Sequence, residues 1–208
     1  MPRLAIFDLD GTLVDSRRDL ADAGNAARAT LGLPALPLAT ITAMIGDGAG
    51  KLIERLTPAG DTETRLRAMA AFRADYATRL TVHTTAYPGI PEALAALRQR
   101  GWRLAVATNK PAVFARPILE RLGLHVDGLR GGEGPTKPDP AMLLDLRREL
   151  GVTAAETWMI GDHHTDLLAA MAAGLRSVHC TWGFGQRGDV QATASAGHPS
   201  ELEGILDA

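Results

Sequence analysis

The strongest constraint on the fold is an alternation of strand-like and helix-like segments from residue 86 onward. Short apolar runs have the length of buried strands, and the amphipathic segments between them end at glycines. Strands are predicted at residues 4–7, 103–108, 126–129, 158–160 and 177–180, and helices at 91–100, 113–122, 140–150, 165–173 and 200–206. This order is typical of a parallel sheet covered by helices on both faces. The sequence therefore predicts an α/β fold with a Rossmann-like parallel sheet core.

Residues 16–86 have a different character, because they carry helical periodicity and no apparent strand. Asp15 or Ser16 is a suitable N-cap for the first helix of this stretch. The glycines within residues 46–50 must loosen or break the second helix. The helices predicted here cover residues 16–31, 38–56 and 62–80.

The predicted organisation is therefore a core domain with an insertion. The core comprises residues 1–15 and 87–208, and the insertion is a helical cap, or lid, domain of residues 16–86. A length of 208 residues suits one core with an inserted module. Because the insertion directly follows the first strand, we expect it over the carboxyl ends of the strands.

Two carboxylates follow the first predicted strand. Asp8 and Asp10 alternate around Leu9, so in extended geometry their side chains point to one side. Both ionise readily only when a cation or good hydrogen bonds lie between them, and carboxylate oxygens suit a hard ion such as Mg²⁺. The simpler alternative is that they cap a turn, with Gly11 supplying unusual backbone angles. Functional groups in open α/β sheets lie just past strand ends, which favours chemistry.

Further polar residues stand just past the other predicted strands, namely Thr108, Asn109, Lys137, Asp162 and Asp166. Phosphoryl transfer requires such groups. A carboxylate attacks phosphorus, a carboxylic acid protonates the leaving oxygen, and hydroxyl, amide and ammonium groups hold the phosphate oxygens. Acidic residues at another strand end would complete a Mg²⁺ site that neutralises the nucleophile and the phosphate.

With these residues in place, the chain resembles the phosphatases of the haloacid dehalogenase superfamily. Four segments match the family motifs in order: FDLDGTLVDS, ATN, TKPDP and GDHHTD. Within the superfamily the chain is most similar to bacterial phosphoglycolate phosphatases, through further matches in residues 45–55, 87–89, 107–120 and 181–183. The resemblance covers essentially the whole chain and implies a haloacid dehalogenase-like core with an inserted helical cap.

The resemblance also implies a role for each motif residue. Asp8 is the expected nucleophile, which forms an aspartyl-phosphate. Asp10 is expected to protonate the leaving alkoxide and then to deprotonate the attacking water. Lys137 is expected to neutralise phosphate and nucleophile together. The residues expected to bind the phosphoryl group are Gly11, Thr108, Asn109 and Lys137.

The metal site implied by the resemblance holds Mg²⁺. Its expected ligands are the Asp8 carboxylate, the Asp10 backbone carbonyl and Asp162. Asp166 is expected in a supporting or water-mediated role. The segment 131–137, which leads to Lys137, is shorter than the loop usual in the family.

The expected function is Mg²⁺-dependent hydrolysis of a small phosphate monoester. The first candidate substrate is 2-phosphoglycolate. Asp10 favours a phosphate ester, because dehalogenases and phosphonate hydrolases of this type lack the second acidic residue. A sugar phosphate, pyrophosphate or a nucleotide monophosphate would use the same core, and a phosphomutase of the same fold would return the phosphate to a sugar. A receiver-like signalling domain and a non-catalytic binding protein are alternatives of another class. The order and completeness of the motifs argue against both.

Several other residues allow competing interpretations. Two adjacent histidines beside carboxylates suggest a Zn²⁺ or Mn²⁺ site; the favoured interpretation is that His163 hydrogen-bonds near the metal and that His164 faces solvent or the lid. Lys51 is interpreted as a surface lysine or a contact to a substrate carboxylate, in preference to a Schiff-base lysine. The segment 46–51 departs from a nucleotide-binding P-loop in its spacing and in the Leu52 that follows.

Composition and charge indicate which binding partners and which cell compartment to expect. A net charge of −2 provides no electrostatic case for nucleic acid or an anionic membrane. We expect no signal peptide and no membrane span, and therefore a cytoplasmic protein. The single cysteine, Cys180, excludes an internal disulfide and is expected to be buried and inert. The expected partner is a small phosphorylated metabolite, bound by a monomer or a homodimer.

Overall fold

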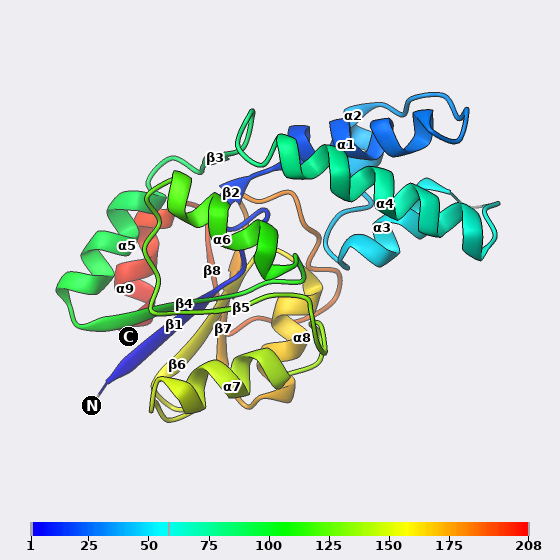
Figure 1. The fold of residues 1–208 in the computed structure, drawn as a ribbon. Helices are drawn as coiled ribbons and strands as arrows, with labels where there is room; N and C mark the ends of the chain where they lie inside the picture. Colours follow the sequence, from blue (N-terminus) through cyan, green and yellow to red (C-terminus); the bar gives the residue numbers. More distant parts are fainter. Residues whose placement is uncertain (1, 58, 208) are drawn as a thin grey trace.

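The computed structural model describes residues 2–57 and 59–207 and contains one large parallel sheet (Figure 1). Within these residues six strands follow the order β5-β4-β1-β6-β7-β8, and all neighbours are parallel. The strands are β1 (Arg3–Phe7), β4 (Trp102–Ala107), β5 (Gly128–Arg130), β6 (Thr157–Gly161), β7 (Arg176–Cys180) and β8 (Ala194–Ala196). The predicted α/β fold with a parallel sheet core is confirmed.

The first strand lies in the middle of the sheet, between β4 and β6. Phe7 is in register with Val106 on one side and with Ile160 on the other. Leu4 to Phe7 are fully buried, as expected for a parallel strand covered on both faces. The chain that leaves β1 therefore emerges at the centre of the carboxyl edge of the sheet.

Helices cover both faces of the sheet, and the side chains of β1 alternate between them. Ala5 and Phe7 pack in one apolar cluster, whereas Leu4 and Ile6 pack in the other. Since successive side chains of a strand point to opposite faces, one apolar run supplies both halves of the core. The first face is covered by α5 (Ile90–Gln99), α6 (Ala112–Arg121) and α9 (Leu202–Leu206), which follows a 3₁₀ turn at Pro199–Glu201; the second is covered by α7 (Ala141–Glu149) and α8 (His164–Ala172).

Four helices in the described part of the chain lie together beyond the carboxyl edge of the sheet (Figure 1). We call them the helical insert: α1 (Arg17–Ala29), α2 (Leu38–Thr42), α3 (Ala49–Leu56) and α4 (Thr62–Thr78). Helix α1 packs along α4 and also contacts α2 and α3. The expected break in the second predicted helix is present between α2 and α3, where Gly46 and Gly48 have φ of 128° and 87°. Their backbone conformation favours glycine and ends the helical run.

The two chain crossings between the sheet and the helical insert are held side by side. Strand β2 (Val14–Asp15) pairs antiparallel with β3 (Thr85–Ala86). The fully buried carboxylate of Asp19 accepts hydrogen bonds from the backbone amides of His83 and Thr84, at 2.9 and 2.8 Å, and from the Thr84 hydroxyl at 2.7 Å. Asp19 thus ties the start of α1 to the segment that leaves the insert.

Three features differ from the sequence prediction. Strand β8 was not predicted, because the small residues Ala194 to Ala196 carry no strand signal. Strand β3 shows that residues 16–86 do contain one short strand, which pairs with β2 just before them. Ser16 occupies the N-cap position of α1, but its hydroxyl donates to Asp10 at 2.5 Å instead of capping the helix. Most other element ends lie within two residues of the prediction.

None of the helices described is long and apolar enough to cross a bilayer.

The substitution Asp19→Ala should lower the free energy of unfolding by about 3 kcal/mol, because it leaves buried donors unpaired at a cost of about 1–3 kcal/mol each. Urea denaturation followed by circular dichroism measures the change. Asp22→Ala is the matched control on the same helix, since Asp22 forms only partly exposed ion pairs with Arg18 and Arg79. If Asp19→Ala lowered the free energy of unfolding no more than Asp22→Ala does, the stabilising role given to Asp19 would be contradicted.

Candidate active site

The carboxyl edge of the sheet gathers the residues singled out from the motifs. They meet there because the carboxyl ends of parallel strands share one edge. Those residues are Asp8, Asp10 and Gly11 after β1, Thr108 and Asn109 after β4, Lys137 from the loop before α7, Asp162 after β6 and Asp166 in the first turn of α8.

Lys137 is buried at the base of this group. Its ammonium donates to Asp8 Oδ1 at 2.8 Å, to Asp166 Oδ1 at 2.6 Å and to the backbone carbonyl of Ala107 at 2.6 Å. The three protons of the ammonium are thereby used. The second oxygen of Asp166 accepts the backbone amide of His163 at 3.0 Å. Asp166 therefore holds Lys137 and the start of α8, and both of its oxygens are engaged by the protein.

Asp162 is fixed by backbone amides from the loop after β7. Its Oδ2 accepts from Phe184 at 3.0 Å and from Gly185 at 2.7 Å, and its Oδ1 accepts from the Thr12 hydroxyl at 3.2 Å. A Cβ atom on Gly11 would lie 2.0 Å from Asp162 Oδ2, and the φ of Gly11 is 90°. Glycine at this turn therefore allows the segment after β1 to lie against the Asp162 carboxylate.

The acidic trio of Asp8, Asp162 and Asp166 has the properties of a site for a divalent metal ion. One carboxylate oxygen from each lies within 4.8 Å of the others, and all three side chains are buried. Burial raises the pKa of Asp8 to about 6 despite the opposing charge of Lys137. Burial, with the charges of Asp8 and Asp166, raises the pKa of Asp162 to about 8. Three carboxylates facing one ammonium leave an excess of negative charge, and an all-oxygen donor set suits a hard cation.

Burial alone would lower the pKa of Lys137, but the carboxylates of Asp166 and Asp8 outweigh it and raise that pKa above its usual value. The ammonium is therefore charged at neutral pH.

A second lysine, Lys110, holds the carboxylate of Asp10. Asp10 Oδ1 accepts from the Lys110 ammonium and from the Ser16 hydroxyl, each at 2.5 Å. Its Oδ2 has no hydrogen-bond partner among the described residues. Lys110 also donates to the hydroxyl of Tyr76 at 2.6 Å, and burial raises the pKa of Tyr76 to about 12. Tyr76 belongs to α4, so a residue of the helical insert contributes to the setting of Asp10.

Lys110 and Tyr76 were not among the residues predicted for the site. The sequence did carry a signal for Lys110, which lies in the TNKP segment directly after the second motif. Tyr76 lies in a helical run without a motif, and only the packing of α4 brings it to the site.

Thr108 and Asn109 differ in what they offer a ligand. The buried hydroxyl oxygen of Thr108 accepts from the Lys110 backbone amide at 3.2 Å, which leaves its proton free to donate. Asn109 accepts from the backbone amide of Lys137 at 2.8 Å and donates to the Lys137 carbonyl at 3.0 Å and to the Gly46 carbonyl at 3.2 Å. The Asn109 side-chain amide thus holds the loop of Lys137 and contacts the insert at Gly46.

A pocket opens over these groups, between the sheet edge and the helical insert. Asp8, Asp10 and Thr108 line it from the sheet, and apolar residues of the insert, such as Leu52 and Phe72, line it from above. Arg73 of α4 also lines the pocket. Its exposed guanidinium forms no ion pair or hydrogen bond with any described residue.

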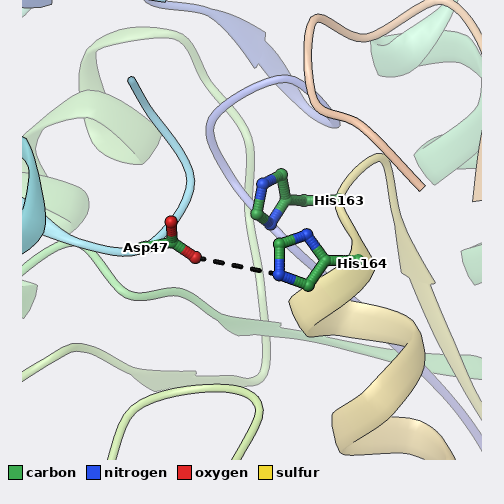
Figure 2. A group of neighbouring side chains, drawn as sticks. All are labelled: Asp47, His163 and His164. Carbon is green, nitrogen blue, oxygen red and sulfur yellow. Dashed lines mark ion pairs between the residues drawn. The ribbon is translucent and has the colours of Figure 1, made fainter. Parts of the chain in front are cut away.

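His163 lines the sheet side of this pocket, and His164 follows it at the start of α8. His163 is the N-cap of α8, and its Nδ1 lies 3.0 Å from the Thr165 hydroxyl. Burial, with the neighbouring His164, lowers the pKa of His163 to about 4, so its imidazole is neutral. His164 faces the insert, with its Nε2 4.0 Å from Asp47 Oδ1 (Figure 2).

Two other residues lie away from the chemistry. Lys51 is 62% exposed and pairs with Glu54 at 3.0 Å on the surface of α3, which agrees with its interpretation as a surface lysine. Cys180 is buried, and burial raises the pKa of its thiol, so it is an unreactive core residue as expected.

Comparison with known proteins identifies the class. A family model described as haloacid dehalogenase-like hydrolase matches residues 2–174, and the chain belongs to that family. The phosphoglycolate phosphatase of Rhodospirillum rubrum is 42% identical over 197 residues, which cover 88% of this chain and 81% of the relative. That of Colwellia psychrerythraea is 39% identical, with 89% and 87% covered. The crystal structure of a predicted phosphoglycolate phosphatase from Haemophilus somnus superimposes with a TM-score of 0.92 at 29% identity, over 98% of this chain and 97% of the other.

The acidic trio makes the stabilising effect of a divalent metal ion depend on pH. In metal-free protein the raised pKa values of Asp8 and Asp162 stabilise the fold fully below about pH 4, and this contribution is lost as pH rises through about 6 and about 8. Bound metal favours the ionised carboxylates, so the rise in Tm on adding Mg²⁺ should be larger at about pH 8 than at about pH 5. Differential scanning calorimetry with EDTA or Mg²⁺ measures it. Asp162→Asn should remove most of the rise, and an equal rise at both pH values in the wild type would refute the expectation.

Proposed function

We propose that the protein is a Mg²⁺-dependent phosphatase that hydrolyses 2-phosphoglycolate to glycolate and phosphate. The observation that carries the proposal is the pair of carboxylates after β1, each held through one oxygen by its own buried lysine. Lys137 holds Asp8 Oδ1 and Lys110 holds Asp10 Oδ1. The other oxygen of each has no hydrogen-bond partner among the described residues, and both side chains line the pocket. Such a pair supplies a nucleophile and a separate proton donor.

In the first step a free oxygen of Asp8 attacks phosphorus, and the bond from phosphorus to the ester oxygen breaks. Asp10 delivers its proton to the leaving alkoxide, which departs as the alcohol group of glycolate. The product on the enzyme is an aspartyl-phosphate at Asp8. Lys137 neutralises the developing charge beside Asp8, and the free proton of Thr108 is available to a phosphoryl oxygen.

In the second step a water molecule attacks the same phosphorus atom. Asp10, now a carboxylate, takes a proton from that water, and the bond between phosphorus and Asp8 breaks. Phosphate leaves, and both side chains return to their starting forms. Asp10 thus acts as acid in one step and as base in the next.

Mg²⁺ would be held by the Asp8 carboxylate, the Asp10 backbone carbonyl and Asp162, and when bound it supplies electrostatic stabilisation of the phosphoryl charge. Asp166 pairs with the Lys137 ammonium through one oxygen, whereas Asp162 forms no ion pair with any described residue, and this difference favours a supporting role for Asp166. The hydrogen bonds of Asn109 to Lys137 favour a positioning role as well.

The proposed substrate rests on the relatives and on one feature of the pocket. Relatives that cover most of this chain are phosphoglycolate phosphatases. A phosphorylated carboxylic acid needs a cation for its second anionic group, and Arg73 is an unengaged guanidinium on the pocket wall. We assign Arg73 to the carboxylate of the substrate, because a planar guanidinium binds a carboxylate through two hydrogen bonds.

The helical insert acts in this proposal as a cap domain of residues 16–86 over a core of residues 1–15 and 87–208. The two crossings at β2 and β3 lie next to those boundaries. The protein would work in the cytoplasm as a monomer or a homodimer.

A panel of phosphate esters assayed with Mg²⁺ tests the function. The wild type should hydrolyse 2-phosphoglycolate faster than a sugar phosphate, pyrophosphate or a nucleotide monophosphate. Asp8→Asn should abolish turnover, and Asp10→Asn should lower kcat by roughly 10²–10⁴, the range for general acid–base catalysis. Isomerisation of a sugar phosphate without net phosphate release would instead identify a phosphomutase and overturn the proposal.

Substitution of Arg73 tests the carboxylate contact. Arg73→Gln should raise KM for 2-phosphoglycolate by about 10- to 100-fold, since a hydrogen bond to a charged group contributes roughly 1.5–3 kcal/mol. For a phosphate ester without a carboxylate, such as p-nitrophenyl phosphate, KM should stay at the wild-type value. Arg67→Gln, on an exposed position of the same helix, is the matched control. Equal changes in KM for both esters would exclude Arg73 as the carboxylate ligand.

A further inference from the structure

A second cluster of metal-ligating side chains lies between the helical insert and the sheet, and its ligands differ from the acidic trio. Asp47 comes from the loop between α2 and α3, and His163 and His164 lie at the start of α8 (Figure 2). One ligand atom from each lies within 4.8 Å of the others. The His164 Nε2 is 4.0 Å from Asp47 Oδ1, and the two imidazole rings have centroids 4.1 Å apart.

His163 and Asp47 are each oriented by a neighbour that leaves a ligand atom available. Nδ1 of His163 is engaged by Thr165, which leaves Nε2. One carboxylate oxygen of Asp47 pairs with Arg55, which leaves Oδ1 toward His164. Metal-binding histidines and carboxylates in proteins are commonly oriented in this way by hydrogen bonds to their other polar atom.

Gly46 brings the insert loop close to the histidines. A Cβ atom on Gly46 would lie 2.6 Å from His163 Nε2, and the φ of Gly46 is 128°. A side chain at this position would push Asp47 away from the two rings. The loop conformation therefore serves the approach between the insert and the start of α8.

We propose that Asp47, His163 and His164 bind a divalent transition-metal ion such as Zn²⁺. Two imidazole nitrogens and one carboxylate oxygen suit Zn²⁺, whereas the all-oxygen acidic trio suits Mg²⁺. Bonds of about 2.0–2.1 Å in a tetrahedral site require ligand atoms about 3.4 Å apart, so the side chains must close by about 1 Å. The side chains of Asp47 and His164 are 22% and 39% exposed and have room to rotate. Water fills the fourth position.

An ion at this site would tie the helical insert to the sheet. His163 and Gly46 both line the substrate pocket, so the tie lies at its edge. Substrate entry and product release would slow while the ion is bound. The site therefore predicts inhibition by Zn²⁺ at saturating Mg²⁺, and this part of the proposal rests on the proposed phosphatase function.

Metal binding is tested without turnover, in full-length protein saturated with Mg²⁺. Isothermal titration calorimetry should detect one Zn²⁺ per chain, and Co²⁺ as a probe should develop the visible absorption of a tetrahedral nitrogen–oxygen site. His164→Ala and Asp47→Ala should each weaken Zn²⁺ binding at least tenfold. His125→Ala, which removes an exposed histidine elsewhere, should leave it unchanged. The two test substitutions lie in different segments, so a folding defect in one leaves the other decisive, and thermal melts identify such a defect.

Several results would overturn the metal site. They are the absence of Zn²⁺ binding in the wild type, wild-type affinity in a folded His164→Ala or Asp47→Ala, and binding that disappears as Mg²⁺ rises, which would assign the ion to the acidic trio.

In a separate assay, Zn²⁺ should inhibit 2-phosphoglycolate hydrolysis in the wild type and in His125→Ala but not in His164→Ala. Equal inhibition of all three proteins would refute the proposal that the ion ties the insert to the sheet. The calorimetry does not depend on the substrate, so it would still test Zn²⁺ binding if 2-phosphoglycolate were not hydrolysed.

Discussion

The buried ammonium of Lys137 is the interaction on which the site depends. Without it, Asp8 and Asp166 would face each other as like charges in a region of low dielectric, where both could not remain ionised. The three bonds of the ammonium fix its position from β4, from the turn after β1 and from α8. Asn109 holds the backbone of the same lysine through two hydrogen bonds. A single cation thus organises three segments that are distant in sequence.

The two carboxylates after β1 have different environments because each faces a different lysine. Asp8 lies with Lys137 and the acidic trio, in the most buried part of the site. Asp10 lies with Lys110 and Ser16, closer to the helical insert. Paired titratable groups in separate environments can take separate roles in one reaction. In the proposed mechanism, two residues from one turn therefore keep separate roles, one attacking phosphorus and the other transferring a proton.

The sequence predicted what depends on local pattern and failed where long-range packing decides. The buried strand of residues 4–7, the parallel order and the motif positions follow from apolar runs, turn residues and spacing. Strand β8 was missed because its residues are small and its pairing with β7 is supplied by tertiary structure. The contact of Tyr76 with Lys110 joins a helix without a motif to the TNKP segment, and no local signal reports it. Asn109 lies just past β4 at the carboxyl edge of the sheet, but its hydrogen bonds to Lys137 and Gly46 depend on how two loops meet.

The hydroxyl of Tyr76 has a consequence for the timing of chemistry. Tyr76 is carried by α4, whereas Lys110 and Asp10 are carried by the sheet. Any displacement of α4 from the sheet would remove one hydrogen-bond acceptor from Lys110 and admit water to an ammonium that is now buried. The lysine would then hold Asp10 less firmly. In the proposed mechanism, Asp10 would therefore reach its working arrangement only after the insert has closed over the bound molecule. Water that enters an open pocket would find the proton-transferring group not yet in position.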